Sequence, residues 1–597
     1  MLNLTSLLII PLIFIGCVLI VSNNIYWNTD SSQTNNLKQI SFLEETNYRI
    51  PFVLQKYYSN IMNIRSNLIP SLITTSFWRV NMEYFKEKML KYQNELINKL
   101  LKRIGLLLSI VLYIVIILFW LKYRRTTLGY QLLTNADSTK GSWNLNITLG
   151  LDGISLPFIV LIGFIFPIVY LSNWSTIDKL DINYIVIIIL LELCLIIVFL
   201  VIDLILFYVF FESILPLLFV LIGLYGAAQK FRAGYYLFLY TLFGSLFMLL
   251  TFLKMGGDSG SSFFEAYTNH STFNTLQEII WIVLFVSFSV KTPLVPLHIW
   301  LPLAHSDANV SGSIVLASII LKLALYGFLR ILIAIFFLAT MRLTPFFLGL
   351  CSMSVIYSSF TTIRQFDLKV LVAYSSIAHM ASSLLGTFSD TIYGLVGSVI
   401  FGLAHGFVSP GLFIVVGAVL YDRCGSRIIN YYRGLNTLLP LLALFFLLLI
   451  FGNMSVPLTG NFVGEFLSLL GAYQQNMFIA SIGALSIILS AVYSIFMYNR
   501  VISGSFSPYL QTIPDIFRKE YYALAPLLLL TIILGIYPNF ISSDIEFGLS
   551  NFLFSWENKS LGLSLIILLI LFKKLYLNWK KNYLKYCGLN FVPYWIK

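Results

Sequence analysis

The sequence predicts an all-α protein that crosses a membrane many times. Hydrophobic residues make up 58% of the 597 residues, charged residues only 11%, and the mean hydropathy is +0.86. Apolar runs close to the ~20 residues that a helix needs to cross a bilayer recur along almost the whole chain. The runs are continuous and lack the alternation of membrane β-strands, so only helices satisfy their backbone polar groups. About fourteen to sixteen membrane helices are expected.

Charge and cysteine content narrow the class of protein further. The net charge of +12 comes largely from loops and the C-terminal tail, which anionic lipid head groups explain without nucleic acid. The five cysteines show no CxxC spacing, which argues against an iron–sulfur cluster or a zinc site. No redox metal or other cofactor is expected in this chain.

Residues 1–148 are expected to form an N-terminal region with two membrane helices and an extramembrane segment. The first apolar run, at residues 1–20, is interpreted as a retained membrane helix. A polar stretch follows, and its end at residues 85–105 has the spacing of an amphipathic surface helix, used for docking or packing. The second span is expected at Ile104–Leu121.

Residues 149–506 are expected to form a dense membrane core, and residues 507–597 to add C-terminal helices and a basic tail. Asp152 is placed to cap a helix that begins near Ile154. The further predicted spans are Tyr184–Leu200, Asp203–Gly226, Gly234–Lys254, Leu276–Leu301, Val310–Leu332, Pro345–Ile363, Lys369–Phe388, Ile392–Leu420, Thr437–Tyr473, Phe478–Asn499 and Tyr522–Ile541. The final apolar run, Leu561–Phe572, is short for a full crossing.

Two of these spans are predicted to be interrupted. Pro293 and Pro296 break helical pairing in the first span, directly after Lys291. The second span breaks at Gly452–Asn461, just before Glu465. Interrupted spans at matching places in two halves indicate an internal repeat, and broken helices in membranes often carry ion sites.

Lys291 and Glu212 are candidate members of such a site. A cation at bilayer depth costs from about 3 to over 10 kcal/mol, so it needs a partner or a water-filled cavity. Glu212 lies well inside its span and can offset this cost as a nearby opposite charge. The alternative is a carboxylate at a helix end near the head groups.

Lys322 is a second lysine far from either end of its span. Ser311, Ser318, Lys322 and Tyr326 are spaced by seven, four and four residues, so they share one helix face that can hold a file of water. A lysine held away from water can exchange its proton at neutral pH. The alternative, a side chain that reaches to the membrane surface, is difficult from so central a position.

Two histidines and one acid complete the set of candidates. His379 and His405 are predicted inside spans, where an imidazole can relay protons in both directions or be a structural group bound to a backbone carbonyl. Glu465 follows the second break and is the candidate for terminal proton exchange. Weaker candidates are Asp203, Glu192 and Arg330, and the loop-bordering His298, His305 and Asp307.

The stretch from about Leu149 to Arg500 resembles the chain 4 family of NADH:ubiquinone oxidoreductase, an antiporter-like membrane subunit of respiratory complex I. The resemblance is carried by LDGISLPFIVL, FYVFFESILPLLFVLIGLYG, VKTPLVPLHIWLPLAH, SGSIVLASIILKLALYGFLR, LVAYSSIAHMASSLLG, AHGFVSPGLFIVVGAVLYDR and TGNFVGEF. It implies two inverted repeats of five helices, each with one discontinuous helix. The candidate residues match family positions: Glu212 and Lys291 at the broken helix, Lys322 at the centre, His379 and His405 as connecting histidines, and Glu465 as the terminal acid. Leu303, Asp307 and Asn309 depart from the family pattern.

The resemblance further implies a proton-translocating membrane-arm subunit in the mitochondrial inner membrane, coupled to redox chemistry elsewhere. Flavin, iron–sulfur clusters and ubiquinone are then expected in partner subunits, with chains 2 and 5, anionic phospholipid and respiratory supercomplex members as partners. Three alternatives remain: a subunit of a cation/proton antiporter, a membrane cytochrome that binds haem through His379 and His405, and a structural scaffold that moves no protons.

Overall fold

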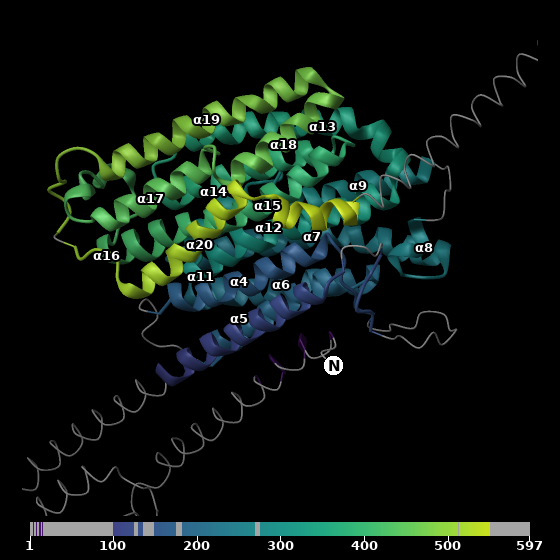
Figure 1. The fold of residues 1–597 in the computed structure, drawn as a ribbon, viewed down its shortest axis with the longest axis horizontal. Coiled ribbons are helices and arrows are strands. Elements are labelled where there is room, and N and C mark those ends of the chain that lie inside the picture. Colours follow the sequence, from purple (N-terminus) through teal and green to yellow (C-terminus); the bar gives the residue numbers. More distant parts are fainter. Residues whose placement is uncertain are drawn as a thin grey trace, which may run out of the picture.

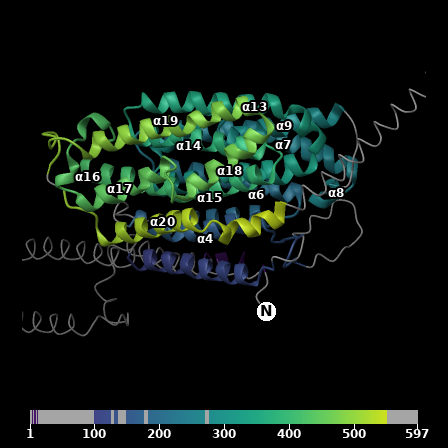
Figure 2. The ribbon, with the colours of Figure 1, turned by 45° about the horizontal axis from the view of Figure 1, so that its top comes forward.

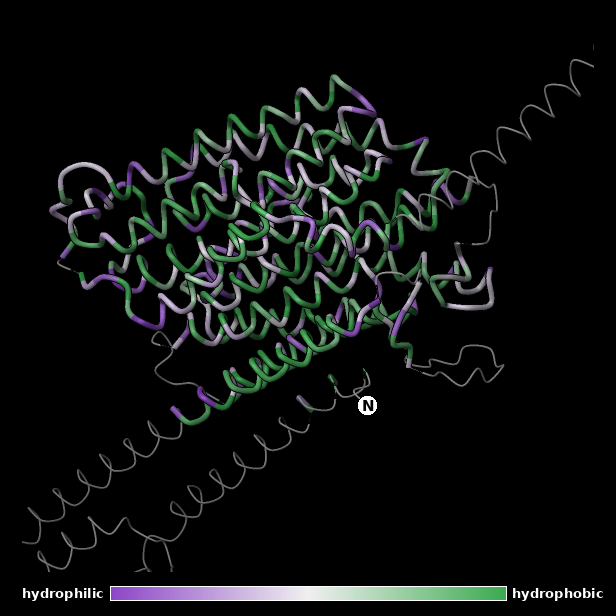
Figure 3. Tube along the Cα trace, in the orientation of Figure 1, coloured by the Kyte–Doolittle hydropathy of each residue, from purple (hydrophilic) through white to green (hydrophobic). Residues whose placement is uncertain are grey.

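The computed structural model describes residues 99–124, 129–134, 148–174, 182–268, 275–511 and 513–549, together with a few isolated positions among the first fifteen residues. It consists of long helices that run side by side through one slab (Figures 1 and 2). Hydrophobic residues dominate the helices, and hydrophilic residues gather mainly toward their ends (Figure 3). The all-α membrane fold is therefore confirmed.

Eleven helices among the described residues are long and apolar enough to cross a membrane. They are Lys99–Lys122, Ser155–Ser172 (α4), Ile182–Leu200 (α5), Leu204–Tyr225 (α6), Lys230–Ser259 (α7), Val310–Ile333, Phe337–Ile363 (α13), Leu368–Thr387 (α14), Ile392–Cys424, Met477–Ile502 (α19) and Arg518–Ile536 (α20). Val310–Ile333 joins α11 (Val310–Val315), η2 (Leu316–Ile320), α12 (Leu321–Gly327) and η3 (Phe328–Ile333), and Ile392–Cys424 joins α15 (Ile392–Phe413), η4 (Ile414–Tyr421) and α16 (Asp422–Cys424). The remaining elements are α8 (Phe264–Thr268), α9 (Thr275–Lys291), α10 (Trp300–Asp307), η5 (Ile429–Tyr431), η6 (Leu435–Thr437), α17 (Pro440–Asn453), α18 (Gly460–Gln475) and a helix at residues 539–549.

Polar side chains begin several of these helices. Asp152 Oδ1 accepts a hydrogen bond from the Ser155 backbone N–H at 2.8 Å, as the sequence predicts. Asp203 caps α6 in the same way through two backbone N–H groups, and Asp367 caps α14. These caps satisfy N–H groups that would otherwise lack partners at the helix starts.

The predicted start of one span at Pro345 is wrong, because α13 begins at Phe337 and includes the proline. Pro345 has no N–H for the Met341 carbonyl, one turn earlier. The Thr344 hydroxyl donates to that carbonyl at 3.3 Å instead. Side-chain hydroxyls of this kind let proline stay inside membrane helices.

Both predicted breaks are present. The first separates α9, which ends at Lys291, from α10, and the Trp300 indole N–H donates to the freed Val290 carbonyl at 2.8 Å. The second separates α17 from α18 at residues 454–459. Each half of the core thus carries one interrupted helix, as expected for two repeats.

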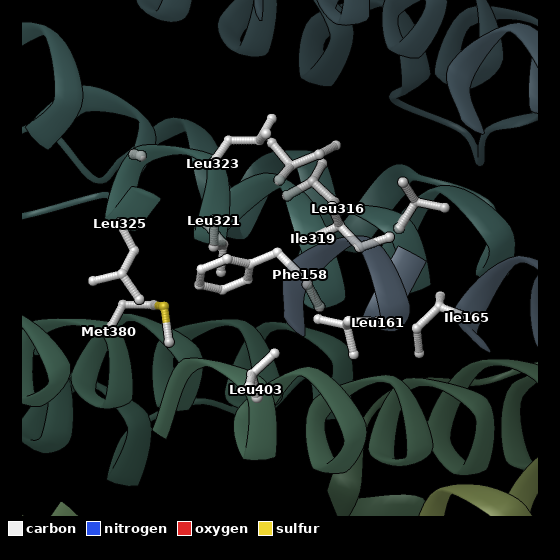
Figure 4. Close-up of a cluster of buried hydrophobic side chains, with 14 of the residues drawn as sticks. Phe158, Leu161, Ile165, Leu316, Ile319, Leu321, Leu323, Leu325, Met380 and Leu403 are labelled. Atoms are coloured by element: carbon white, nitrogen blue, oxygen red, sulfur yellow. The ribbon is translucent and has the colours of Figure 1, made fainter. Parts of the chain in front are cut away.

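The core between these halves is closely packed. Figure 4 shows Phe158 and Leu161 of α4 facing Leu316, Ile319 and neighbouring residues of the helix Val310–Ile333, with Leu403 of α15 beneath them. All of these side chains are buried. The first apolar run, most of the predicted surface helix at residues 85–105 and the run at residues 561–572 lie outside the described residues, so the three-region division stays a prediction.

Candidate functional site

Lys291 and Glu212 lie together at the first helix break. Lys291 is the last residue of α9 and only 2% exposed, and its Nζ lies 3.7 Å from Oε1 of Glu212 on α6. It also donates to the Phe211 carbonyl at 3.0 Å and lies 3.2 Å from the centre of the Phe211 ring. Its charge is therefore compensated by a carboxylate, a carbonyl dipole and an aromatic face.

Lys322 occupies the centre of the molecule and is fully buried. Its Nζ donates to the Ala317 carbonyl at 2.6 Å and to Nδ1 of His405 at 2.9 Å. Ala317 belongs to the π-helical segment η2, whose wider turn breaks the regular pairing of carbonyls with N–H groups one α-turn later. Local π-helical geometry thus supplies one of the two acceptors of this ammonium group.

The two candidate histidines lie side by side. Their ring centres are 5.6 Å apart, and both side chains are buried between α14 and α15. His379 Nε2 lies 3.0 Å from Oδ1 of Asn453, at the end of α17, and 3.4 Å from the Tyr493 hydroxyl. The sequence analysis missed Asn453 and Tyr493, since no local pattern distinguishes them from other polar residues in spans.

Glu465 is buried on α18, just after the second break. Its two carboxylate oxygens accept hydrogen bonds from the hydroxyls of Ser455 and Ser486, each at 2.5 Å. Ser455 lies in the break itself and Ser486 on α19. The carboxyl group therefore joins three elements of the second half.

The candidates form three groups rather than one chain of direct contacts: Glu212 with Lys291, Lys322 with the two histidines, and Glu465 with two serines. Lys322, His405 and His379 are adjacent, whereas no hydrogen bond or ion pair joins Lys291 to Lys322 in the described part of the chain. Phe288 of α9 packs against Phe211, which contacts Lys291, and against Phe328 of η3, with ring centres 6.2 Å and 5.5 Å apart. The first pair can thus act on Lys322 through the electric field of a low-dielectric layer.

Arg330 and Asp152 form a buried ion pair that the sequence analysis did not anticipate. Their atoms Nη2 and Oδ2 are 2.8 Å apart, and both side chains are 8% exposed. The pair ties the start of α4 to η3, on the helix that carries Lys322. A structural role is sufficient to explain Arg330, and the capping role explains Asp203.

His305 and Lys369 differ from expectation. His305 was expected to border a loop, but it lies fully buried in α10, stacked on Phe413 with ring centres 4.5 Å apart. Packing of α10 against α7 and α14, together with this contact to Phe413 of α15, explains the burial. Lys369, predicted only as the start of a span, is 4% exposed and donates to the Ala308 carbonyl at 2.8 Å.

Within the described ranges, no group of three or more His, Cys, Asp or Glu side chains is arranged to hold a metal ion. The candidate side chains are lysines, histidines and glutamates held on long apolar helices. Chemically, such groups can hold and pass protons.

The fold and site define an antiporter-like membrane subunit. Residues 202–490 match the family model described as the transmembrane region of NADH:quinone oxidoreductase and Mrp antiporter proteins. A chain of the respiratory complex I structure from Thermus thermophilus is 27% identical with a TM-score of 0.68, over 76% of this chain and 95% of that one. A chain of the Mrp complex from Dietzia has the same TM-score at 15% identity, which shows a shared fold alone.

Closer relatives specify the family. NADH-ubiquinone oxidoreductase chain 4 of Mycosarcoma maydis is 44% identical over 456 residues, which cover 76% of this chain and 94% of the relative. The protein of that name from Arabidopsis thaliana is 41% identical over 76% of this chain and 92% of its own length. The chain belongs to the NADH-ubiquinone oxidoreductase chain 4 family. With its many spans and these eukaryotic relatives, it is a protein of the mitochondrial inner membrane.

Proposed function

We propose that this chain moves protons across the mitochondrial inner membrane as a membrane-arm subunit of NADH:ubiquinone oxidoreductase. The proposed proton carriers are Lys322, His405, His379 and Glu465, and Glu212 and Lys291 form the charge pair that acts on them. One observation carries the proposal: the Lys322 ammonium lies 2.9 Å from Nδ1 of His405, and both groups are buried at the centre of the bundle. A donor and an acceptor at this distance can exchange a proton directly.

The order of the groups suggests how a proton moves. A change of charge at the Glu212–Lys291 pair alters the field at Lys322 and favours transfer of its proton to His405. His379 lies beside His405 and near Tyr493. The proposed proton route ends at Glu465, which exchanges its proton with water at the exit. Moving one charge against 100 mV costs about 2.3 kcal/mol. Two unit charges about 4 Å apart interact by about 4 kcal/mol at an effective dielectric constant of about 20, so a change at this pair is large enough.

Electron transfer is assigned to other subunits in this proposal. Flavin, iron–sulfur clusters and ubiquinone would lie in those partners, with chains 2 and 5 as neighbours and anionic lipids around the basic loops. The cation/proton antiporter alternative has less support, since relatives at 41–44% identity are oxidoreductase subunits by name. The haem alternative also has less support, because the two imidazole rings pack directly against each other, 5.6 Å apart, where α14 and α15 are in close contact.

The variant Lys322→Ala tests the proposal in the assembled enzyme, reconstituted in sealed vesicles. Loss of a positioned proton carrier slows transfer by a factor of about 100 or more, so we expect NADH-driven proton pumping to be lost. The matched control is Lys254→Ala, which removes a 56% exposed lysine paired with Asp258 and should pump normally. Normal pumping by Lys322→Ala would show that the subunit is a scaffold rather than a proton channel.

A further inference from the structure

Glu192 is a buried acid that the proposed route does not use. It lies near the middle of α5 (Ile182–Leu200) and is 0% exposed. Neither of its carboxylate oxygens has a hydrogen-bond partner among the described residues. An ionisable side chain at this depth is costly to retain and is more often functional than incidental.

A second buried polar group has no hydrogen-bond partner among the described residues and lies within electrostatic range of Glu192. Tyr170 of α4 is 5% exposed, lies within electrostatic reach of Glu192, and its hydroxyl has no hydrogen-bond partner in the described part of the chain. Buried polar atoms that lack a protein partner are usually satisfied by ordered water. Bound water would supply the missing partners of both side chains.

Polar groups continue from Tyr170 to the helix that carries Lys322. Tyr170 also interacts electrostatically with Tyr184. The Tyr184 hydroxyl accepts a hydrogen bond from Asn173 at 2.9 Å and lies beside Ser311. Ser311, Ser318 and Lys322 follow one another along this helix, with Ser318 inside the π-helical segment η2. These tyrosines lie on α4 and α5, which pack directly on this helix through Phe158, Phe199 and Tyr326, with centres of Phe199 and Tyr326 5.0 Å apart.

We infer that Glu192 is a further proton-exchange site of this subunit, joined through Tyr170, Tyr184 and bound water to Ser311 and hence to Lys322. This inference rests on the proposed function of Lys322. An ionised carboxylate without hydrogen-bond donors costs several kcal/mol at this depth, so Glu192 holds its proton until a base is available.

The transfer balances as a simple acid–base exchange. After Lys322 has passed a proton to His405, it is a neutral amine. The O–H bond of the Glu192 carboxyl breaks, one proton moves along the polar row, and the products are a Glu192 carboxylate and a Lys322 ammonium. A proton entering from the Asn173 end of α4 then restores the neutral acid.

Four variants in the assembled enzyme, reconstituted in sealed vesicles, test this inference. Glu192→Gln keeps the size of the side chain and removes its ionisable proton, and we expect the rate of NADH-driven pumping to fall by about tenfold or more. Glu192→Asp keeps the carboxyl group and should pump faster than Glu192→Gln. Tyr170→Phe removes only one hydroxyl and should also slow pumping. Asp203→Asn is the matched control, because Asp203 is 1% exposed but caps α6, a role that Asn fills equally well.

The ranking of the variants separates a proton role from a packing role. A packing role would tolerate the isosteric Gln better than the shorter Asp, so faster pumping by Glu192→Gln than by Glu192→Asp overturns the inference. Normal pumping by both Glu192→Gln and Tyr170→Phe, alongside failure of Lys322→Ala, also overturns it and leaves the proposed function intact. Normal pumping by Lys322→Ala in the same experiment would instead contradict the proposed function itself.

Discussion

The two buried lysines are stabilised in different ways, and the difference assigns them different roles. Lys291 has a carboxylate, a backbone carbonyl and an aromatic face around its ammonium group. Lys322 has a backbone carbonyl and an imidazole, and within the described residues no carboxylate lies at ion-pair distance from it. A cation without a counter-charge gives up its proton more readily. Lys322 is therefore the better proton donor, and Lys291 the better fixed charge.

Asp390, in the turn between α14 and α15, gives a prediction about pH. Burial raises the pKa of its carboxyl from 3.8 to about 7. The folded protein therefore binds this proton more tightly than the unfolded chain does. The resulting stabilisation is complete below pH 3.8 and is lost as the pH rises through about 7.

We expect Asp390→Asn to remove this pH dependence, so that the variant gains thermal stability relative to the wild type at pH 8 but not at pH 5. The measurement is the temperature at which the purified enzyme loses NADH oxidation, across that pH range. Asp258→Asn, at a 54% exposed position, serves as the control. Identical pH profiles for Asp390→Asn and the wild type would contradict the assignment.

At the scale of the elements, close packing of α15 on α18 brings the histidine helix next to the Glu465 helix. A Cβ atom at Gly464 would lie 2.5 Å from the backbone N and Cα of Phe401, and one at Gly397 would lie 2.6 Å from the Ser468 backbone N. Small residues at such contacts let membrane helices approach closely. The glycines therefore set the distance between the carriers of the second half.

The variant Gly464→Ala should lower the stability of the assembled subunit by about 1–3 kcal/mol, because the Phe401 backbone must move. Gly349→Ala on α13 is the matched control: nothing lies within 4 Å of its added Cβ, and alanine favours helix. The amount of assembled enzyme and its thermal inactivation measure the effect. Equal stability of the two variants would mean that the helices can separate without cost.

Three π-helical segments, η2, η3 and η4, lie in the two fully buried helices of the core. Their sequences are ordinary apolar runs, so composition does not predict them. Segment η2 matters most, because its Ala317 carbonyl accepts a hydrogen bond from Lys322. Such segments often mark functional sites.

On the scale of the whole molecule, no hydrogen bond or ion pair among the described residues joins the Glu212–Lys291 pair to the Lys322–His405 pair. The structure therefore favours electrostatic coupling over direct proton transfer between the two groups. In a low-dielectric layer, a change of one charge strongly alters the electrostatic energy of neighbouring charged groups.

This coupling is tested by Glu212→Gln and by the double variant with Lys291→Met. Glu212→Gln leaves the buried Lys291 charge without its carboxylate, which should destabilise the subunit by about 3–5 kcal/mol and stop pumping. The double variant removes both charges, so assembly should recover while pumping stays lost. Native gels and vesicle pumping assays give the two readouts, and normal pumping by the double variant would contradict electrostatic control by this pair.

Local sequence features were enough to predict most of the fold. Hydropathy and helical spacing identified the spans, and prolines and glycines identified both breaks, because these signals depend on residues close together in the chain. The same signals singled out Glu212, Lys291, Lys322, His379, His405 and Glu465 as unusual. Pro345 was misjudged because the compensating hydroxyl of Thr344 acts through local geometry that composition does not reveal.

By itself, the sequence determined that this is a helical membrane protein with two interrupted spans and a set of ionisable residues inside them. Only the tertiary structure decided which of those residues meet. Lys322 and His405 are 83 residues apart, and Arg330 pairs with Asp152, which lies just before α4. The structure also left Glu192 without a hydrogen-bond partner in the described part of the chain. Contacts between distant residues depend on how whole helices pack, and no local pattern encodes that arrangement.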